Sequence, residues 1–405
     1  MHPPENNSTR KGAASFGVIT NTAKDNINLH GRYCTNPFNH FEVTENGRVW
    51  LCCPNNVPHP IGNVLHTLDF DDIWNGEKAL LVRRSILNGK FNYCHHFWCP
   101  EIQTGTLPLK KDLFGNNQFA RTNIPNAYGP KQEAEWEVLS KDVFKGQREW
   151  TDEELKMPPP TMIAFSNDCS CNLHCHSCRP DKIIHSSGRA LKTAQLITDK
   201  LVSAFLTEPT DRYFKIHLLG SGDIFSSKPI REMLYNIDGA VFPNLEIDLI
   251  TNGILLTEKM WKRLHKIHKN LTMINISVDA GTKETYEQKT RLGGNWDVLL
   301  KNIDYLYGKW NHDSLENHRF NFVLSYVVQA NNYKEMVTFA NLINKYDKIN
   351  IYFSLVDDWG QVTFNQDAVW QTTHPDHNEF LEVLQHPIFD HPNIQIGNLT
   401  KFRNT

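Results

Sequence analysis

The stretch Cys169-Ser170-Cys171-Asn172-Leu173-His174-Cys175-His176-Ser177-Cys178 determines what kind of domain the chain builds. It directly follows a short apolar run, 162–165, that has the character of a strand. The spacing Cys171-x3-Cys175-x2-Cys178 lets three thiolates on one short loop face a common point. Three thiolates hold three corners of a four-iron cluster and leave the fourth iron open, whereas a structural metal site is closed by four ligands.

Composition narrows the class of protein. The chain has 405 residues and a formal net charge of −3, and this near-neutral balance argues against a protein that coats nucleic acid. No run of about 20 apolar residues is present and the N-terminus is polar, so we expect no membrane span, no secretion signal and a cytoplasmic location. All nine cysteines lie between Cys34 and Cys178, and in a reducing compartment such a clustered set favours metal binding over disulfides.

Strand-like and helix-like segments alternate from residue 161 onward. Helices are expected at roughly 190–206, 228–237, 257–269, 283–308 and 333–346, and strands at 162–165, 214–219, 245–250, 273–278, 320–328 and 349–355. The alternation predicts an α/β domain with right-handed crossovers and a mainly parallel sheet. In barrels of this kind the working residues sit at the C-terminal ends of the strands.

The N-terminal part carries a separate group of cysteines. Two short apolar runs flank Asn46-Gly47, which predicts a β-hairpin over 41–51. A helix is expected over 72–87, weakened by Gly76 and ended by Gly89.

The three-cysteine motif, with Asn172 after its first cysteine, resembles the signature of the radical S-adenosylmethionine (radical SAM) superfamily. The resemblance implies a partial (β/α)6 barrel. It also implies a [4Fe–4S] cluster held by Cys171, Cys175 and Cys178, with S-adenosylmethionine bound at the open iron. One-electron cleavage of that cofactor gives a 5′-deoxyadenosyl radical, which abstracts a hydrogen atom from the substrate.

Residues at the strand ends resemble the segments with which this family binds its cofactor. The segment 220–223 is similar to the family's Gly-Gly-Glu segment, and a Thr-Asn-Gly ending follows the third strand. The resemblance implies a ribose contact for Ser277 and a cofactor-carboxylate contact for Arg291. One departure is Ser177, since the family often has an aromatic residue there. The implied cofactor-binding residues are Ser221, Gly222, Asp223, Asn252, Ser277, Asp279 and Arg291.

The first group of cysteines, with its hairpin glycine and its Gly-Asn and Ile-Trp landmarks, resembles the SPASM/Twitch auxiliary-cluster module. The resemblance implies a second [4Fe–4S] cluster, fully ligated by Cys34, Cys52, Cys94 and Cys99. Cys53 is an alternative to Cys52, although neighbours in a strand face opposite sides and only one should ligate. His95 and His96 are alternative ligands, and a zinc knuckle is the structural alternative.

These assignments give five expected segments: a flexible tail (1–30), a SPASM/Twitch-like module (31–105), a connecting region (106–159), the radical SAM partial barrel (160–356) and a C-terminal extension (357–405). The module precedes the barrel here, whereas in the family it usually follows.

The resemblance favours oxidative modification or cross-linking of a ribosomal peptide, with a flavodoxin or ferredoxin as reductant and no nucleic-acid or membrane partner. A dehydrogenase or epimerase of a sugar-like molecule is the alternative. No cysteine follows Cys178 to return a hydrogen atom, although Tyr326 and Tyr352 are candidates. A different class remains open: a non-enzymatic zinc or iron–sulfur protein. In such a protein Cys169 would be the fourth ligand of a closed site with Cys171, Cys175 and Cys178. Four further residues are candidates to face substrate, although a structural role is the commoner one for each: His185, His217, Asp358 and Trp359.

Overall fold

The computed structural model describes residues 19, 27–29, 31–67, 69–96, 99–109, 149–219, 221–312, 320–358 and 363–403. Most of the expected tail and residues 110–148 of the connecting region lie outside these ranges. The described residues form two compact units. The first holds those up to Asn167 with Asp199–His217 and Phe242–Leu245, and the second holds Asp168–Thr198, Leu218–Val241 and Glu246 onward. No helix in the described ranges combines the length and apolar character needed to cross a bilayer.

The strands of the first unit follow the order β5-β4-β1-β2-β3. The predicted hairpin is confirmed: β1 and β2 are antiparallel, with Glu42 opposite Trp50. Gly47 makes the turn with φ 76°, a left-handed conformation that favours glycine. The strand bounds are β1 (His40–Thr44), β2 (Arg48–Trp50), β3 (Gly62–Asn63), β4 (Met162–Ser166) and β5 (Phe214–Leu218).

Strand β1 of the cysteine-rich module also pairs in parallel with β4, from His40 opposite Met162 to Thr44 opposite Ser166. Between them the buried Ser166 Oγ donates a hydrogen bond to Glu42 Oε1 at 3.1 Å. The strand that leads into the Cys171–Cys178 loop is thus fixed by the N-terminal module. The helices of this unit are α1 (Asn36–Asn39), α2 (Asp71–Trp74), α3 (Glu77–Leu87), α4 (Pro100–Thr104) and α8 (Asp152–Leu155).

The single helix expected over 72–87 is wrong, because the chain forms two helices, α2 and α3, separated at Gly76. Gly76 has an extended ψ of 163°, and a Cβ there would lie 2.3 Å from the Asp72 carbonyl oxygen. Phe41 and Trp74 pack with Phe70 and Phe205 into an aromatic core beside this break.

The second unit is a parallel arrangement of strands in the order β6-β7-β8-β9-β10. The six strands predicted from residue 162 onward are confirmed as β4 to β9, each within two residues of its expected bounds. The expected C-terminal extension adds one more strand, because β10 pairs with β9. The bounds are β6 (Leu245–Thr251), β7 (Leu271–Ser277), β8 (Asn321–Val328), β9 (Asn350–Leu355) and β10 (Ile394–Gln395).

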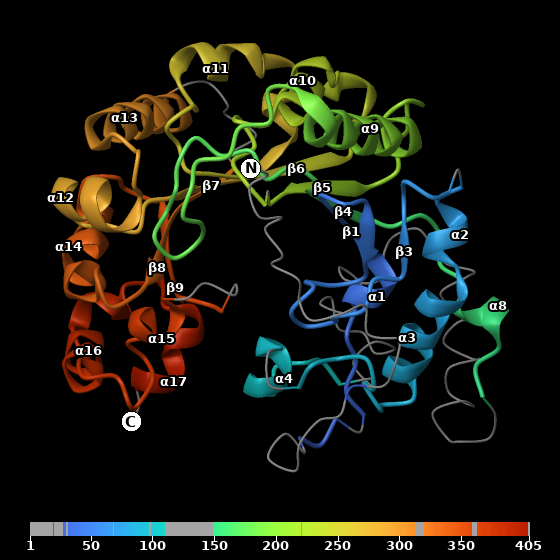
Figure 1. The fold of residues 1–405 in the computed structure, drawn as a ribbon, viewed down its shortest axis with the longest axis horizontal. Helices are drawn as coiled ribbons and strands as arrows, with labels where there is room; N and C mark the ends of the chain where they lie inside the picture. The colour runs from blue at the N-terminus through green and yellow to red at the C-terminus, as the bar shows by residue number, and fades with distance from the viewer. Residues whose placement is uncertain are drawn as a thin grey trace, which may run out of the picture. The chain divides into compact units, whose positions relative to one another are not determined.

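Figure 1 shows α11, α13 and α14 along one side of strands β6 to β9. The helix expected over 283–308 is broken, since a π-helical turn, η4 (Tyr286–Thr290), is followed by Gly293 with φ 80°. The α-helices are α10 (Lys228–Asn236), α11 (Glu258–Arg263), α12 (Lys283–Thr285), α13 (Trp296–His312), α14 (Met336–Ala340), α15 (Phe364–Asp367), α16 (His377–Leu384) and α17 (Thr400–Arg403), with α9 (Gly188–Phe205) divided between the units. The 3-10 turns are η2 (Gly239–Val241), η3 (His265–Asn270), η5 (Tyr333–Glu335), η6 (Asn341–Asn344), η7 (Pro387–Asp390) and η8 (Gly397–Leu399).

Candidate functional site

The loop that carries Cys171, Cys175 and Cys178 is closed on itself by main-chain hydrogen bonds. Cys171 N donates to Ile183 O at 2.6 Å, and Cys178 N donates to Cys175 O at 3.0 Å. The three thiols differ in exposure: Cys175 is buried, Cys171 is partly buried and Cys178 is exposed. We call residues 169–185 the cluster loop.

The first half of the cluster loop is held by Asn172. Its Oδ1 accepts hydrogen bonds from Ser226 Oγ at 2.9 Å and from Asn252 Nδ2 at 2.8 Å. Asn252 Nδ2 also lies 3.8 Å from the Cys171 sulfur. The residue after the first motif cysteine therefore joins the loop to the segments that follow β5 and β6.

The buried side chain of Asp223 joins the segments that follow β5 and β6. Its buried carboxylate accepts four hydrogen bonds, from Thr251 Oγ1 at 2.7 Å and from the main-chain N–H groups of Asn252, Phe225 and Ser226. Burial raises the pKa of Asp223, and these donors offset part of that shift. Because both oxygens are occupied, the side chain positions neighbouring segments rather than presenting a free carboxylate.

Gly222 permits a close main-chain contact. A Cβ at this position would lie 2.1 Å from the carbonyl oxygen of Ser170, so only glycine fits without a shift of the cluster loop. Asp223 N donates to the same Ser170 oxygen at 2.8 Å. The neighbouring Ser221 carbonyl accepts a hydrogen bond from Arg179 Nη2. Gly220 lies outside the described residues.

The second half of the cluster loop is held by the broken helix. His174 N donates to Leu292 O at 3.0 Å, and His176 N donates to Thr290 O at 3.3 Å. Between these acceptors, Arg291 directs Nη1 to the Cys175 sulfur at 3.4 Å. The π-helical turn η4 therefore delivers a guanidinium group to a cluster thiol, and such turns are frequent at functional sites.

Arg291 is also paired with Asp279, whose Oδ2 lies 2.5 Å from Arg291 Nη2. Burial by itself lowers the pKa of Arg291, but the Asp279 carboxylate and the Cys175 thiol outweigh it, and the pKa is raised. Asp279 has φ 57° and its Oδ1 accepts from Val327 N at 2.7 Å. Asp279 and Arg291, each predicted as a cofactor-binding residue, thus form an ion pair beside the second motif cysteine.

Two buried polar atoms of this region have no hydrogen-bond partner, Arg291 Nε and Tyr286 Oη. Ser277, at the end of β7, accepts a long hydrogen bond from Ser325 Oγ at 3.4 Å. Unpartnered buried donors beside the cluster-loop thiols fit a ligand that carries a carboxylate group. The residues present therefore fit the cofactor that the cysteine motif implies.

The thiols need a cation in order to ionise. Burial raises the pKa of Cys171 to about 11 and raises that of Cys175, with Arg291 offsetting part of the second shift. Metal ligation requires the thiolate, so binding of a cation is coupled to loss of these protons.

Sequence reasoning missed two contacts of the cluster loop. His176 Nε2 lies 3.1 Å from Asp367 Oδ1, which connects the loop to α15 in the expected C-terminal extension. Arg179, directly after the last motif cysteine, donates Nη1 to Cys169 O at 2.5 Å. A cationic residue next to clustered thiols is a signal that the sequence does carry.

The other candidates occupy varied environments. Tyr326 is buried and donates its hydroxyl to Asn332 O at 2.7 Å, whereas Tyr352 is exposed on β9. His185 contacts Asp168 through Nδ1 at 2.9 Å. His217 lies on β5 and Asp358 follows β9, while Trp359 is outside the described residues.

The first unit contains a second thiol site. Cys34, Cys52, Cys94 and Cys99 line one cavity, together with side chains that include Asn36, Asn56 and Glu101. Asn36 Nδ2 lies 3.4 Å from the Cys52 sulfur, and the Cys99 thiol donates to Glu101 Oε2 at 3.3 Å. Cys53, His95 and His96 are not among the described residues that line this cavity.

The four thiols of this cavity are more difficult to ionise than ordinary cysteines. Burial raises the pKa of Cys52 and of Cys99 to about 12 each, and raises those of Cys34 and Cys94 well above the usual range. Neighbouring thiols in the cavity raise the pKa of Cys34 and Cys94 further. Stable thiolates here therefore require a bound cation.

The spacing of the thiols bears on the kind of metal. Ligand atoms around one tetrahedral zinc stand roughly 3.3–3.8 Å apart. Among the described residues, which include all nine cysteines, one group brings three ligand atoms within 4.8 Å of one another, and it is Asp168, Cys169 and His185. Neither predicted thiol set is drawn together as around a single zinc ion, and a four-iron cluster is the larger group.

Comparison with known proteins agrees with this geometry. A model described as the radical SAM superfamily matches residues 169–342, and a model described as the iron–sulfur cluster-binding SPASM domain matches residues 34–100. The radical SAM domain implies a [4Fe–4S] cluster and S-adenosylmethionine, and the SPASM domain implies auxiliary iron–sulfur clusters.

Individual relatives are distant. The AdoMet-dependent heme synthase of Methanosarcina barkeri (strain Fusaro / DSM 804) is 26% identical over 148 residues, which cover 36% of this chain and 39% of that protein. The chain therefore aligns with about two fifths of that curated relative. Streptococcus suis SuiB bound to S-adenosylmethionine is 14% identical with a TM-score of 0.40, covering 73% of this chain and 62% of that one.

Native anSMEcpe with bound AdoMet and Kp18Cys peptide is 16% identical with a TM-score of 0.38, covering 57% of this chain and 60% of that one. Likeness at this level carries no argument about activity. The two matched domains carry the assignment: the chain contains a radical SAM domain over residues 169–342, preceded by a SPASM-type iron–sulfur module over residues 34–100.

Proposed function

We propose that Cys171, Cys175 and Cys178 hold the open [4Fe–4S] cluster and that the strand-end residues around them bind S-adenosylmethionine. When bound, the cluster and cofactor supply one-electron cleavage to a radical that removes a hydrogen atom from a substrate C–H bond. The observation that carries this proposal is the convergence of Asn252, Gly222 and Arg291 on the two halves of the cluster loop.

Each predicted cofactor residue has a specific part in this proposal. Gly222 and Ser221 provide the main-chain surface for the amino group, and Ser277 provides a ribose contact. Arg291 anchors the cofactor carboxylate through a charge-assisted hydrogen bond, and Asp279 orients its guanidinium. Asp223 and Asn252 position the segments that form this surface, because their side chains are occupied by hydrogen bonds within the protein.

We assign the auxiliary cluster to Cys34, Cys52, Cys94 and Cys99, which line one cavity. Four thiolates leave no iron open for substrate, so the role of this cluster is electron relay. Asn36 and Asn56 direct N–H groups to the Cys52 sulfur, and hydrogen bonds to ligand sulfurs tune reduction potential.

We propose that the substrate is a ribosomal peptide that undergoes oxidative modification or cross-linking, with a flavodoxin or ferredoxin as the electron donor. A sugar-like small molecule, dehydrogenated or epimerised, is the second substrate class. The genes beside this one select the compounds to test: a short precursor peptide in the first case, sugar-biosynthesis enzymes in the second. A product lighter by two hydrogens supports oxidation, and an unchanged mass with inverted stereochemistry supports epimerisation.

The central test is anaerobic reconstitution followed by metal analysis. The wild-type protein should hold about eight irons per chain, as two four-iron clusters, and should release 5′-deoxyadenosine from S-adenosylmethionine under dithionite. Replacing Cys171, Cys175 and Cys178 together with Ala should remove about half of the iron and all of that release.

Cys169→Ala is the matched control, since it removes a thiol of the same loop that the proposal leaves outside the cluster. It should keep both the iron and the cleavage. Release of 5′-deoxyadenosine by the triple variant would contradict the proposal. A colourless protein that holds zinc and cleaves nothing would establish the non-enzymatic alternative.

A further inference from the structure

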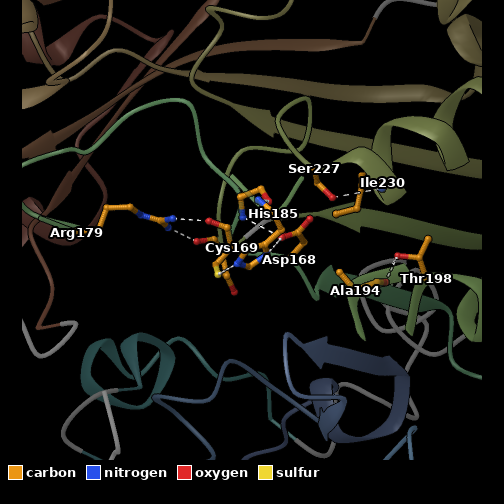
Figure 2. Close-up of polar contacts among 10 residues, drawn as sticks. Asp168, Cys169, Arg179, His185, Ala194, Thr198, Ser227 and Ile230 are labelled. Atoms are coloured by element: carbon orange, nitrogen blue, oxygen red, sulfur yellow. Dashed lines mark hydrogen bonds and ion pairs between the residues drawn. The ribbon is translucent and has the colours of Figure 1, made fainter. Parts of the chain in front are cut away.

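A compact group of side chains at the two ends of the cluster loop takes no part in the proposed function. Asp168 and Cys169 lie just after β4, separated from it by Asn167, and His185 ends the loop that carries the three motif cysteines. Figure 2 shows the three side chains gathered in one place. One ligand atom from each lies within 4.8 Å of the other two.

The geometry of this group leaves a place for a cation. His185 Nδ1 lies 2.9 Å from Asp168 Oδ1, and Cys169 Sγ lies 3.8 Å from His185 Nε2. An ionised carboxylate only accepts hydrogen bonds, so a proton fills the space between the imidazole and Asp168. A metal ion bound to Nδ1 would replace that proton, because a coordinating imidazole nitrogen carries no hydrogen.

Asp168 shows that the group is not complete as a purely protein network. Its side chain is fully buried, and Oδ1 accepts from both Ser170 N and Ser170 Oγ at 2.9 Å. The other oxygen, Oδ2, is buried without any hydrogen-bond partner. A buried carboxylate oxygen without a donor is costly, and coordination of a cation would satisfy it.

We propose that Asp168, Cys169 and His185 form a third metal site, which binds one divalent ion of the zinc class. Thiolate, imidazole and carboxylate are all zinc ligands, and two of them are anions that balance the charge of the ion. The Cys169 sulfur needs to approach the other two ligand atoms by about 1 Å to reach tetrahedral separations. Three protein ligands leave the fourth position to water.

Access and local charge are compatible with this site. His185 has a side-chain exposure of 22%, which gives the ion a path from solvent. Figure 2 also labels Arg179, whose guanidinium donates to the carbonyl oxygens of Cys169 and Ser221. Its positive charge opposes the binding of a second cation, so we expect moderate rather than very tight affinity.

The site would join the two ends of the cluster loop. Cys171 N already bonds Ile183 O, and His185 N already bonds Ser170 Oγ at 3.0 Å. A metal ion held by Cys169 and His185 adds a third link around the same ring of chain. It would therefore stabilise the loop whether or not the iron–sulfur cluster is bound.

The test uses the anaerobically reconstituted protein, titrated with Zn²⁺ against a chromophoric chelator after loosely bound metal is removed. Wild-type protein should bind one zinc per chain beyond its iron. Cys169→Ala and His185→Ala should weaken that binding at least tenfold, and Asp168→Asn should weaken it similarly. His391→Ala is the matched control, because His391 is an exposed histidine far along the chain.

A second readout is independent of affinity. Titration with Co²⁺ should give a thiolate-to-cobalt charge-transfer band in the wild type, and Cys169→Ala should abolish it. Iron content and circular dichroism of each variant establish that it is folded. The proposal is overturned if the wild type binds no more zinc than Cys169→Ala, or if Cys169→Ala loses iron, which would make Cys169 a cluster ligand. Cofactor cleavage is measured separately, so failure of the proposed function would be recognised independently.

Discussion

The two thiol sites of this protein are built in opposite ways. Cys34, Cys52, Cys94 and Cys99 line one cavity; Cys34 is partly exposed and the other three are buried, and loss of solvation raises the pKa of all four. The three thiols of the cluster loop range from the buried Cys175 to the exposed Cys178. The first arrangement suits a cluster whose irons are all closed off, and the second suits a cluster that must meet another molecule.

The two sites also differ in how far along the chain their supports lie. The auxiliary cavity is lined by residues between Cys34 and Leu107. The cluster loop is held by Asn252, by Thr290 to Leu292 and by Asp367, which is 191 residues from its partner His176. A closed cluster can be assembled by a local module, whereas an open one depends on residues from several strand ends.

The neighbouring pair Cys52 and Cys53 gives the most direct test of how the auxiliary site differs from the cluster loop. Cys52→Ala should remove the iron of the auxiliary cluster, about four atoms per chain, because it lines the cavity and accepts hydrogen bonds from Asn36 and Asn56. Cleavage of S-adenosylmethionine should persist, since the cluster loop is intact. Iron analysis and Mössbauer spectroscopy measure the loss.

Cys53→Ala is the matched control and should keep all of its iron, because Cys53 is partly exposed and is not among the described residues that line the cavity. Loss of iron in Cys53→Ala with retention in Cys52→Ala would exchange the two assignments. Equal loss in both variants would show that iron binding does not depend on which of the two neighbouring thiols lines the cavity.

The next largest effect is expected at the ion pair that serves the open site. Arg291→Ala leaves the Asp279 carboxylate buried without its partner, and removing one member of a buried pair costs about 3–5 kcal/mol of unfolding free energy. Cofactor cleavage should be lost as well, because the proposed carboxylate anchor is gone. Chemical denaturation of Arg291→Ala, Asp279→Ala and the double variant gives the coupling between the two.

Lys283→Ala provides the surface comparison, because Lys283 pairs with Asp297 at 2.6 Å in an exposed position. Exposed pairs are screened by water and salt, so this variant should unfold at nearly the wild-type denaturant concentration. If Arg291→Ala were as mild as Lys283→Ala, the Arg291–Asp279 pair would not be the support of the open site that we infer.

Much of the fold follows from the sequence because its signals are local. Alternating apolar runs placed all six strands from β4 to β9, and the Asn46-Gly47 pair placed the hairpin. The errors lie where glycine acts within a helical pattern. Gly76 separates α2 from α3, and the left-handed Gly293 follows the π-helical turn that breaks the expected helix over 283–308.

Less of the candidate site could be predicted from the sequence, because its contacts join residues that are distant along the chain. Motif spacing identified Cys171, Cys175 and Cys178, but no pattern in the chain reveals that Asp223 accepts from Thr251 or that His176 meets Asp367. The group of Asp168, Cys169 and His185 likewise becomes visible only when the cluster loop closes. Residue types are read from sequence, whereas their pairing across strand ends requires the fold.

The smallest effect should come from glycines that allow close approach in each region. Gly222→Ala places a Cβ against the main-chain oxygen of Ser170, which cannot rotate away, and overpacking of this kind costs about 1–3 kcal/mol. The shift should appear as loss of iron from the open cluster.

Gly47→Ala should cost about 1–2 kcal/mol through its φ of 76° and should disturb the auxiliary cluster instead. Gly308→Ala has no atom within 4 Å of the new Cβ and lies inside helix α13, so it should stabilise the protein by about 0.5–1 kcal/mol. Thermal unfolding with iron analysis measures all three, and equal loss from both clusters in Gly222→Ala would show that the two sites are not supported separately.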